Sequence, residues 1–232
     1  MLLRQYYLEC LAQASYLLGD RASGVAVVVD PRRDVDVYVD AAEAEGLRIE
    51  HVFLTHFHAD FASGHLELKH RCGAEIHLGH AAQTEYPFTP AHEGESWTFG
   101  DLRIEILATP GHTPESISLL VFDLAKNSNR PCAVLTGDCL FIGDVGRPDL
   151  LAATGLTREE MAEQLYRSTR EKLMTLPDET LVYPGHGAGS MCGKSLSTET
   201  VSTIGEQRLS NPALQPMSPE AFVALVCDGQ PT

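Results

Sequence analysis

Four apolar segments of this chain run directly into a residue that can bind a metal ion, and this pattern constrains the fold most. The segments are predicted strands, and the residues at their ends are His56, His112, Asp138 and His186. Strands of a layered protein end at common edges, where loops carry the functional side chains. One histidine has many ordinary roles, but four such endings in one chain predict a shared metal site.

The first ending carries the pattern His-x-His-x-Asp, formed by His56, His58 and Asp60. On an extended strand or its exit loop, residues two apart point to the same side. On an α-helix the same spacing would place them about 200° apart. The pattern therefore predicts a loop at a strand end. Glycine precedes the other three residues, which suits a backbone that bends sharply to aim each side chain inward.

The order of predicted elements indicates a layered α/β sandwich. β-branched and alternating apolar runs predict strands, and helical spacing of apolar residues predicts helices. The predicted strands are 5–8, 15–18, 24–30, 49–54, 75–78, 97–99, 102–107, 117–122, 133–135 and 181–183; the predicted helices are 34–45, 66–71 and 158–176.

We expect one catalytic domain over residues 1–210. Residues 211–232 carry proline and other turn-forming residues around one short apolar segment, 221–226. This composition predicts a C-terminal tail or linker, and an end at 229–232 is typical of a chain cut from a longer protein.

The charge balance and cysteine usage exclude several classes of protein. With 17 basic and 32 acidic residues the formal charge is −15, which would repel a nucleic-acid backbone. No apolar run approaches the roughly 18 residues that span a bilayer, and no secretory signal is visible. The 6 cysteines form no Cys-x-x-Cys pair, so we expect free thiols and a cytoplasmic protein.

The motifs around these residues resemble those of the metallo-β-lactamase superfamily. The segments are Thr-His-Phe-His-Ala-Asp at 55–60, Thr-Pro-Gly-His at 109–112, Thr-Gly-Asp at 136–138 and Tyr-Pro-Gly-His at 183–186. The resemblance implies a four-layer αββα sandwich with the metal at one edge, between the two sheets. Dinuclear zinc hydrolases of this family carry a second-metal histidine after the first motif, where this chain has Phe61. A phenylalanine ring donates no lone pair, so we expect one metal per chain.

The ligand set alone leaves two metals open. Zinc with an open position would activate water. Iron(II) held by two histidines and one carboxylate would keep positions for a thiol and dioxygen.

Three further segments, 60–65, 141–150 and 186–194, resemble persulfide dioxygenases, closest to the bacterial branch fused to rhodanese domains. This resemblance implies one Fe(II), held by His56, His112 and Asp138. It leaves His58, Asp60 and His186 close to the metal without binding it. The implied reaction oxidises a low-molecular-weight thiol persulfide, such as glutathione persulfide, with O₂ to sulfite and thiol.

Three residues are candidates for substrate binding. Arg147 suits a carrier carboxylate, with an ion pair to Asp149 or Asp144 as the equal alternative. Cys192 is either a thiol acting on sulfur, with its pKa lowered by Lys194, or a buried small side chain. The hydroxyl of Tyr183 is a weaker candidate. We interpret Cys139 as a core residue.

Two other functions compete with the dioxygenase. One is a mononuclear zinc thioester hydrolase resembling glyoxalase II. The other is a sulfur-carrier or docking module with a structural metal and an exchanging Cys192. We further expect a homodimer, and a rhodanese domain or a sulfurtransferase as partner.

Overall fold

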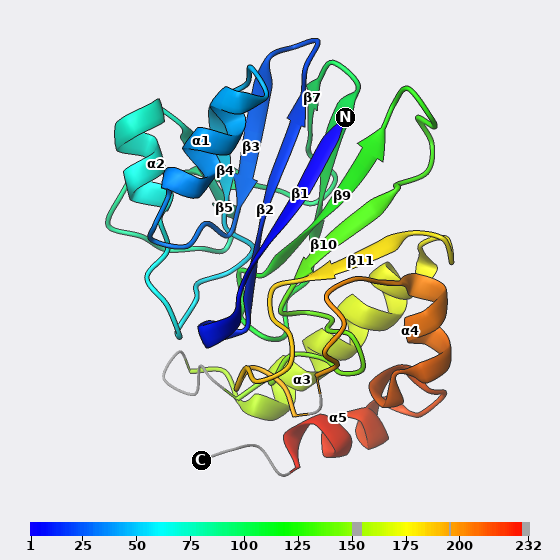
Figure 1. Cartoon of the computed structure of the whole chain (residues 1–232). Helices are drawn as coiled ribbons and strands as arrows, with labels where there is room; N and C mark the ends of the chain where they lie inside the picture. Colours follow the sequence, from blue (N-terminus) through cyan, green and yellow to red (C-terminus); the bar gives the residue numbers. More distant parts are fainter. Residues whose placement is uncertain (150–154, 195, 229–232) are drawn as a thin grey trace.

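The computed structural model describes residues 1–149, 155–194 and 196–228, and within them it contains two six-stranded sheets packed face to face (Figure 1). The first sheet has the strand order β1-β2-β3-β4-β5-β6. Its strands are β1 (Leu2–Leu8), β2 (Gln13–Asp20), β3 (Val25–Val29), β4 (Arg48–Phe53), β5 (Glu75–Gly79) and β6 (Thr89–Ala91). Strands β1 to β3 pair antiparallel, and β3 to β6 pair parallel.

The second sheet has the order β12-β11-β10-β9-β8-β7. Its strands are β7 (Ser96–Phe99), β8 (Leu102–Ala108), β9 (Ile117–Asp123), β10 (Ala133–Gly137), β11 (Leu181–Pro184) and β12 (Ser202–Thr203). All pairs are antiparallel except β10 with β11. The short strands β6 and β12 are additions that the sequence did not predict.

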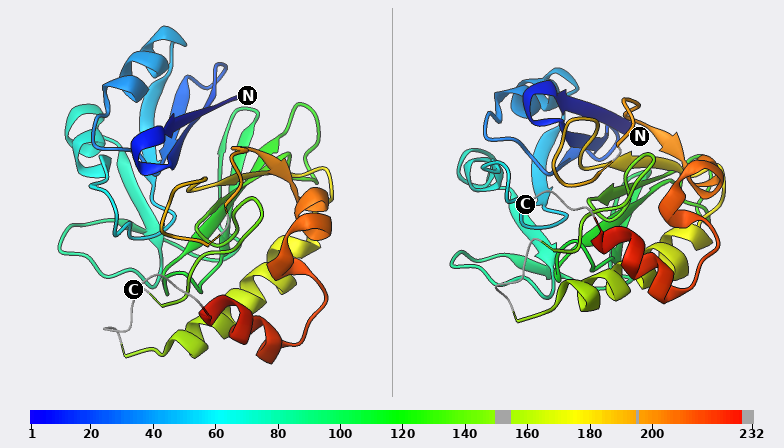
Figure 2. Two further views of the ribbon diagram at one scale, coloured as in Figure 1. Left: turned by 60° about the horizontal axis from the view of Figure 1, so that its bottom comes forward. Right: turned by 90° about the horizontal axis from the view of Figure 1, so that it is seen from below.

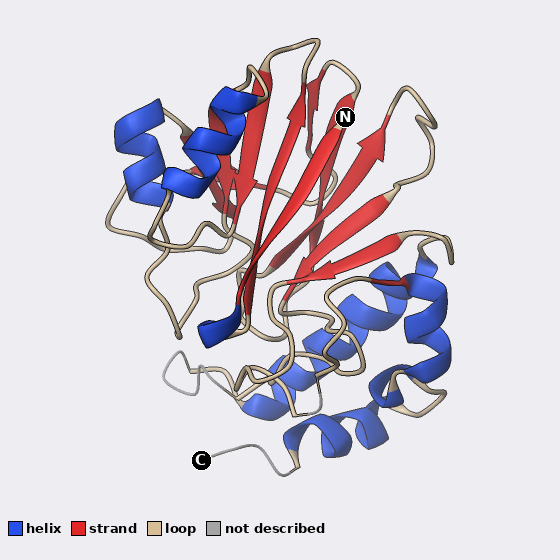
Figure 3. Cartoon of the chain, viewed as in Figure 1, coloured by secondary structure: helices blue, strands red, loops and turns tan. Residues whose placement is uncertain are grey.

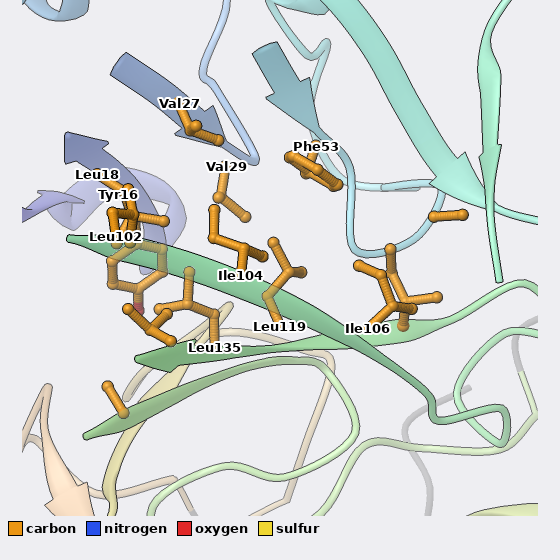
Figure 4. Packing of buried hydrophobic residues seen from close by; sticks show 14 of the residues in the cluster. Tyr16, Leu18, Val27, Val29, Phe53, Leu102, Ile104, Ile106, Leu119 and Leu135 are labelled. Atoms are coloured by element: carbon orange, nitrogen blue, oxygen red, sulfur yellow. The ribbon is translucent and has the colours of Figure 1, made fainter. Parts of the chain in front are cut away.

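Helices cover the outer faces of both sheets, as Figures 2 and 3 show. Helices α1 (Asp36–Ala44) and α2 (His65–Cys72) lie on the first sheet, and α3 (Arg158–Arg167), α4 (Ile204–Ser210) and α5 (Pro219–Cys227) lie on the second. Apolar side chains from both sheets fill the space between them, with Val29 and Phe53 facing Ile104 and Leu119 (Figure 4). The predicted four-layer sandwich is therefore confirmed.

The predicted long helix 158–176 is regular only in its first part. Thr157 and Glu160 form a capping box at its start, and α-helical geometry ends at Arg167. A π-helical turn follows over Ser168–Lys172, then a 3₁₀ turn over Leu173–Thr175. In the π turn the Ser168 hydroxyl donates to the Pro110 carbonyl at 2.7 Å. The irregular turn thus braces the loop that carries His112.

The segment expected to be a C-terminal tail or linker packs onto the rest of the domain over its described residues. Residues Pro212–Leu214 form a 3₁₀ turn, and α5 begins at Pro219 behind the capping residue Ser218. Phe222 is fully buried and packs edge to face on Tyr166 of α3. Within 221–226, Phe222 and Val226 are buried because α3 offers them an apolar surface. Residues 229–232 lie outside the described residues. No helix in the described ranges has both the length and the apolar character needed to cross a membrane.

Candidate metal centre

The four strand endings meet at one edge of the sandwich, as the sequence predicts. His56 follows β4 of the first sheet, whereas His112, Asp138 and His186 follow β8, β10 and β11 of the second. All four residues are buried. The backbone amide of Gly185 donates to the Gly137 carbonyl at 2.8 Å, and this bond holds two of the loops together.

His56, His112 and Asp138 present three ligand atoms to one point. The Oδ2 atom of Asp138 lies 3.7 Å from Nε2 of His56 and 3.5 Å from Nε2 of His112. All three ligand atoms lie within 4.8 Å of one another. One cation can contact atoms at this spacing at about 2.1 Å each, so the residues fit a single bound metal.

The second ring nitrogen of each ligand histidine is held by a partner. Nδ1 of His112 lies 2.9 Å from the Arg147 carbonyl, which can only accept. Nδ1 of His56 lies 2.9 Å from the Thr55 hydroxyl. With its proton on Nδ1, each imidazole keeps the Nε2 lone pair for a metal.

Asp30 fixes the direction of the bonds at Thr55. Its carboxylate accepts the Thr55 amide at 2.8 Å and the Thr55 hydroxyl at 2.7 Å. Since that hydroxyl donates to Asp30, its lone pair is free to accept from His56. Asp30 is buried and has a left-handed backbone with φ of 50°, a conformation that costs energy in residues other than glycine. Sequence reasoning missed Asp30, although it too follows a buried strand directly.

His186 bridges two carboxylates and does not join the three ligands. Its Nδ1 lies 2.8 Å from Oδ1 of Asp138, and its Nε2 lies 2.9 Å from Oδ2 of Asp60. Asp60 is 32% exposed at its side chain, so it stands at the mouth of the site. The bridge orients Asp138 with Oδ2 toward the two ligand histidines.

His58 lies beside the ligands with its ring centroid 4.2 Å from that of His56. Its Nε2 contacts Oδ1 of Asp30 at 3.0 Å. Its Nδ1 is buried and has no hydrogen-bond partner among the residues that the structure describes. His58, Asp60 and His186 therefore all lie next to the metal ligands.

The electrostatic environment suits a divalent cation. Burial and the neighbouring His58 hold the pKa of His56 well below its usual value, and burial lowers the pKa of His112. Burial opposes ionisation of Asp138, but His186 and His56 outweigh it and hold that pKa well below the usual range. The ligand set at neutral pH is thus two neutral imidazoles and one carboxylate.

Two glycines of the motifs allow close approaches that a side chain would block. A Cβ on Gly137, whose φ is 52°, would lie 2.6 Å from the Thr55 hydroxyl. A Cβ on Gly185 would lie 2.5 Å from Oδ1 of Asp138. Gly137 thus has the bent backbone that the sequence predicts, and at Gly185 the absence of a side chain leaves room for Asp138.

Phe61 stands at the position where the resemblance to dinuclear enzymes implies a second-metal histidine, and it lies beside His58. Its ring packs 4.4 Å from that of His58, centroid to centroid. Asp60, His186 and Cys192 do offer ligand atoms within 4.8 Å of one another. Both nitrogens of that histidine already contact carboxylates, however, and burial raises the pKa of the Cys192 thiol.

The three substrate candidates, Arg147, Cys192 and Tyr183, each have contacts within the protein. Arg147 is 8% exposed and binds both carboxylate oxygens of Asp149, at 2.7 and 2.8 Å, so the ion-pair alternative is the arrangement found. Cys192 is also 8% exposed. Lys194, expected to activate it, instead donates to the carbonyls of Leu225 and Asp228. Tyr183 packs edge to face on Tyr16, in the core between the sheets.

Cys139 is buried, and burial raises the pKa of its thiol to about 12. This placement agrees with its interpretation as a core residue.

A cavity of about 460 Å³ adjoins the centre, with Asp60 and Phe61 in its wall. Arg32 and Arg33 also line it. Arg32 is 3.7 Å from the carboxylate of Asp34, and Arg33 is exposed. The cavity thus lies beside the buried ligands, and its wall carries both guanidiniums, from Arg32 and Arg33, and carboxylates, from Asp34 and Asp60.

Known proteins share this arrangement. The family model described as the metallo-beta-lactamase superfamily matches residues 8–186. The mitochondrial persulfide dioxygenase ETHE1 of Homo sapiens is 33% identical over 234 residues, which cover 97% of this chain and 80% of that protein. The structure of ETHE1 from Myxococcus xanthus matches with a TM-score of 0.82 at 33% identity, covering 98% of this chain and 91% of the other. A metallo-beta-lactamase from Staphylococcus aureus matches with a TM-score of 0.91 at 36% identity, covering 100% and 68%. With these matches, the strand-end motifs and the four-layer fold, this chain belongs to the metallo-β-lactamase superfamily.

Proposed function

We propose that this chain is an iron(II) persulfide dioxygenase. The reaction is R–S–SH + O₂ + H₂O → R–SH + SO₃²⁻ + 2 H⁺, and the carrier thiol is of low molecular weight. The observation that carries the proposal is the set of two histidines and one aspartate, with Phe61 beside it in place of a second-metal ligand. The human and Myxococcus relatives support the same reaction.

Iron(II) bound by two histidines and one carboxylate supplies adjacent open positions for a thiolate sulfur and dioxygen. The chain's own residues hold the donor atoms in place for it. Asp30 and Thr55 fix the proton of His56 on Nδ1, and His186 fixes the carboxylate of Asp138. Burial of the ligands excludes bulk water, while Asp60 faces the entrance.

The cavity beside Asp60 suits a thiol carrier that bears carboxylates. Arg33 lies in its wall and offers an exposed guanidinium, a group that binds carboxylates through two parallel hydrogen bonds. Glutathione persulfide has two carboxylates and a terminal sulfur that would extend toward the ligands. We therefore assign carrier recognition to this wall, since Arg147 is held by Asp149.

A zinc thioester hydrolase remains the second candidate, because three protein ligands with an open position also suit catalytic zinc. Two measurements separate the candidates. Protein purified without added metal is analysed for iron and zinc, and oxygen uptake and sulfite release are followed with glutathione persulfide. The dioxygenase consumes oxygen in step with persulfide and stops when oxygen is removed. Anaerobic cleavage of a glutathione thioester, with no sulfite from persulfide, would establish the hydrolase instead.

The setting of the enzyme is part of the proposal. All 6 cysteines are free, which supports a reducing compartment such as the cytoplasm. A homodimer and a rhodanese or sulfurtransferase partner follow from the resemblance to the rhodanese-fused branch. Light scattering of the purified chain and a sulfite assay with an added sulfurtransferase test these two points.

A further inference from the structure

A second group of metal-binding side chains lies on the first sheet, outside the catalytic centre. His51 of β4 and Glu75 and His77 of β5 offer ligand atoms within 4.8 Å of one another. Nδ1 of His51 lies 2.9 Å from Nε2 of His77. Oε2 of Glu75 lies 3.7 and 3.8 Å from these two nitrogens. The three atoms form a triangle of the size that one small cation needs.

The strand register builds this group. His51 is paired with Glu75 and Phe53 with His77 in the parallel ladder of β4 and β5. Residues two apart on a strand share a face, so Glu75 and His77 point to the same side as His51. Five residues, or about 16 Å of extended chain, separate His51 from His56. The group is therefore distinct from the catalytic ligands.

Neighbouring side chains hold the three groups in place. The ring of His77 is fully buried and stacks on Phe53 with centroids 4.3 Å apart. The ring of His51 lies 4.9 Å from that of Phe99 of β7. The other carboxylate oxygen of Glu75 accepts the Thr89 hydroxyl of β6. The group thus sits where the edge of the first sheet meets β7 of the second.

The group lacks a full set of partners of its own. Nδ1 of His77 is buried without a hydrogen-bond partner within the described part of the chain, so no acceptor there fixes the ring proton, and the atom offered to a cation is Nε2. If both imidazoles are neutral, only one proton lies between Nδ1 of His51 and Nε2 of His77. The nearby carboxylate of Glu75 then has no donor from either of these two nitrogens. Burial lowers the pKa of His51 and lowers that of His77 to about 4. Both rings are thus neutral at pH 7, the form in which histidine binds metals.

We propose that His51, Glu75 and His77 form a second, structural site for a divalent transition-metal cation of the zinc type. Two imidazoles and one carboxylate are ligands that zinc accepts, and water can complete the coordination. A cation there would replace the contact between the His51 and His77 rings with three coordination bonds, and these bonds would link β4 to β5. The site is additional to the one metal expected at the catalytic centre, and its occupancy does not depend on the reaction catalysed there.

The single tryptophan of the chain provides a direct readout. Trp97 lies 5.0 Å from His77, centroid to centroid. Cobalt(II) bound at the site should therefore quench its fluorescence, and zinc, a filled-shell ion, should reverse the quenching by displacement. The titration uses the iron-loaded enzyme under anaerobic conditions. Equilibrium dialysis against zinc should find one more metal per chain than the iron alone.

Two variants test the assignment, and one serves as a control. The side chain of Glu75 is 51% exposed, so the Glu75→Gln variant should fold. Trp97 emission that is unchanged in the metal-free variant would show that the fold is intact. Glu75→Gln and His51→Gln should abolish saturable quenching and the extra zinc, with persulfide oxidation retained. His70→Gln, at an exposed histidine of α2, should bind as the wild type does. The catalytic-centre variant His112→Ala, which is expected to lack iron and is therefore titrated as purified, should keep the quenching.

The proposal is overturned if wild-type protein shows no saturable quenching. It is equally overturned if Glu75→Gln and His51→Gln bind the extra zinc as tightly as the wild type. Loss of the extra zinc in His112→Ala alone would place the second metal at the catalytic centre and not on β4 and β5.

Discussion

Replacing Asp30 with asparagine tests whether this buried carboxylate controls the metal site without touching the metal. Asparagine tolerates the left-handed backbone of this position, so the substitution keeps the shape of the turn. It removes the charge beside His58 and replaces one accepting oxygen with a donating amide. If that amide faces the Thr55 hydroxyl, the hydroxyl loses the acceptor that holds its proton and is free to donate to Nδ1 of His56. The proton of His56 would then sit on Nε2, the atom that should bind the metal.

The expected loss is that of a partner that orients a ligand. Outer partners of metal-binding histidines are worth about 10- to 100-fold in metal affinity, which is about 1.4 to 2.7 kcal/mol. In the other amide orientation the Thr55 hydroxyl keeps its acceptor. The amide NH₂ group then takes the place of Oδ1 of Asp30, which lies 2.8 Å from the Thr55 backbone nitrogen and 3.0 Å from Nε2 of His58. Neither orientation restores the wild-type bonds, so the loss should be at least tenfold.

Iron affinity is measured by competition with a chelator, and thermal unfolding of the metal-free protein checks the fold. Asp34→Asn is the matched control, because Asp34 is exposed near the same turn, with a side chain 66% accessible. It should hold iron as the wild type does. Unchanged iron affinity in Asp30→Asn, with the fold intact, would refute the role given to Asp30 in fixing the proton of His56.

Five further substitutions have expected outcomes. His112→Ala should lose iron and activity, whereas His58→Ala should keep much of its iron; equal losses by metal analysis would contradict the division between ligand and neighbour. Phe61→His should raise the affinity for a second zinc in dialysis, and no change would mean that Phe61 is not what excludes it. Arg33→Ala should raise KM for glutathione persulfide with less effect on kcat, and the reverse pattern would remove it from carrier binding. Phe222→Ala should destabilise the fold by about 3 to 5 kcal/mol in denaturant unfolding, and a loss below about 1 kcal/mol would show that α5 contributes little.

Short motifs made the clustering of the candidate metal ligands predictable from the sequence, while partners distant in the chain stayed hidden. His56, His112 and Asp138 each follow a strand within a few residues, so local pattern and topology together bring them to one edge. Asp30 also follows a strand, but its role depends on Thr55 and His58, 25 and 28 residues away. A single aspartate before a proline is also what an ordinary strand end looks like.

Two expectations depend on competition between partners, which the sequence alone does not resolve. Arg147 could bind a substrate or a neighbouring carboxylate, and the turn that follows brings Asp149 within reach of both sides of its guanidinium. The segment 221–226 is too short to form a core alone, so it resembles a linker until the surface of α3 is known. In each case the residue type is informative, but the three-dimensional neighbour decides the role.

The metal ligands come from both sheets, and this has a consequence for how the site forms. His56 is carried by the first sheet, and His112 and Asp138 by the second. Neither sheet alone can assemble the set, so the site exists only when the apolar faces have packed against each other. Metal binding is therefore coupled to the packing of Phe53, Ile104 and their neighbours, because a ligand that binds only the folded state stabilises that state. The bond network through Asp30 extends this coupling, since it ties the end of β3 to the ligand at the end of β4.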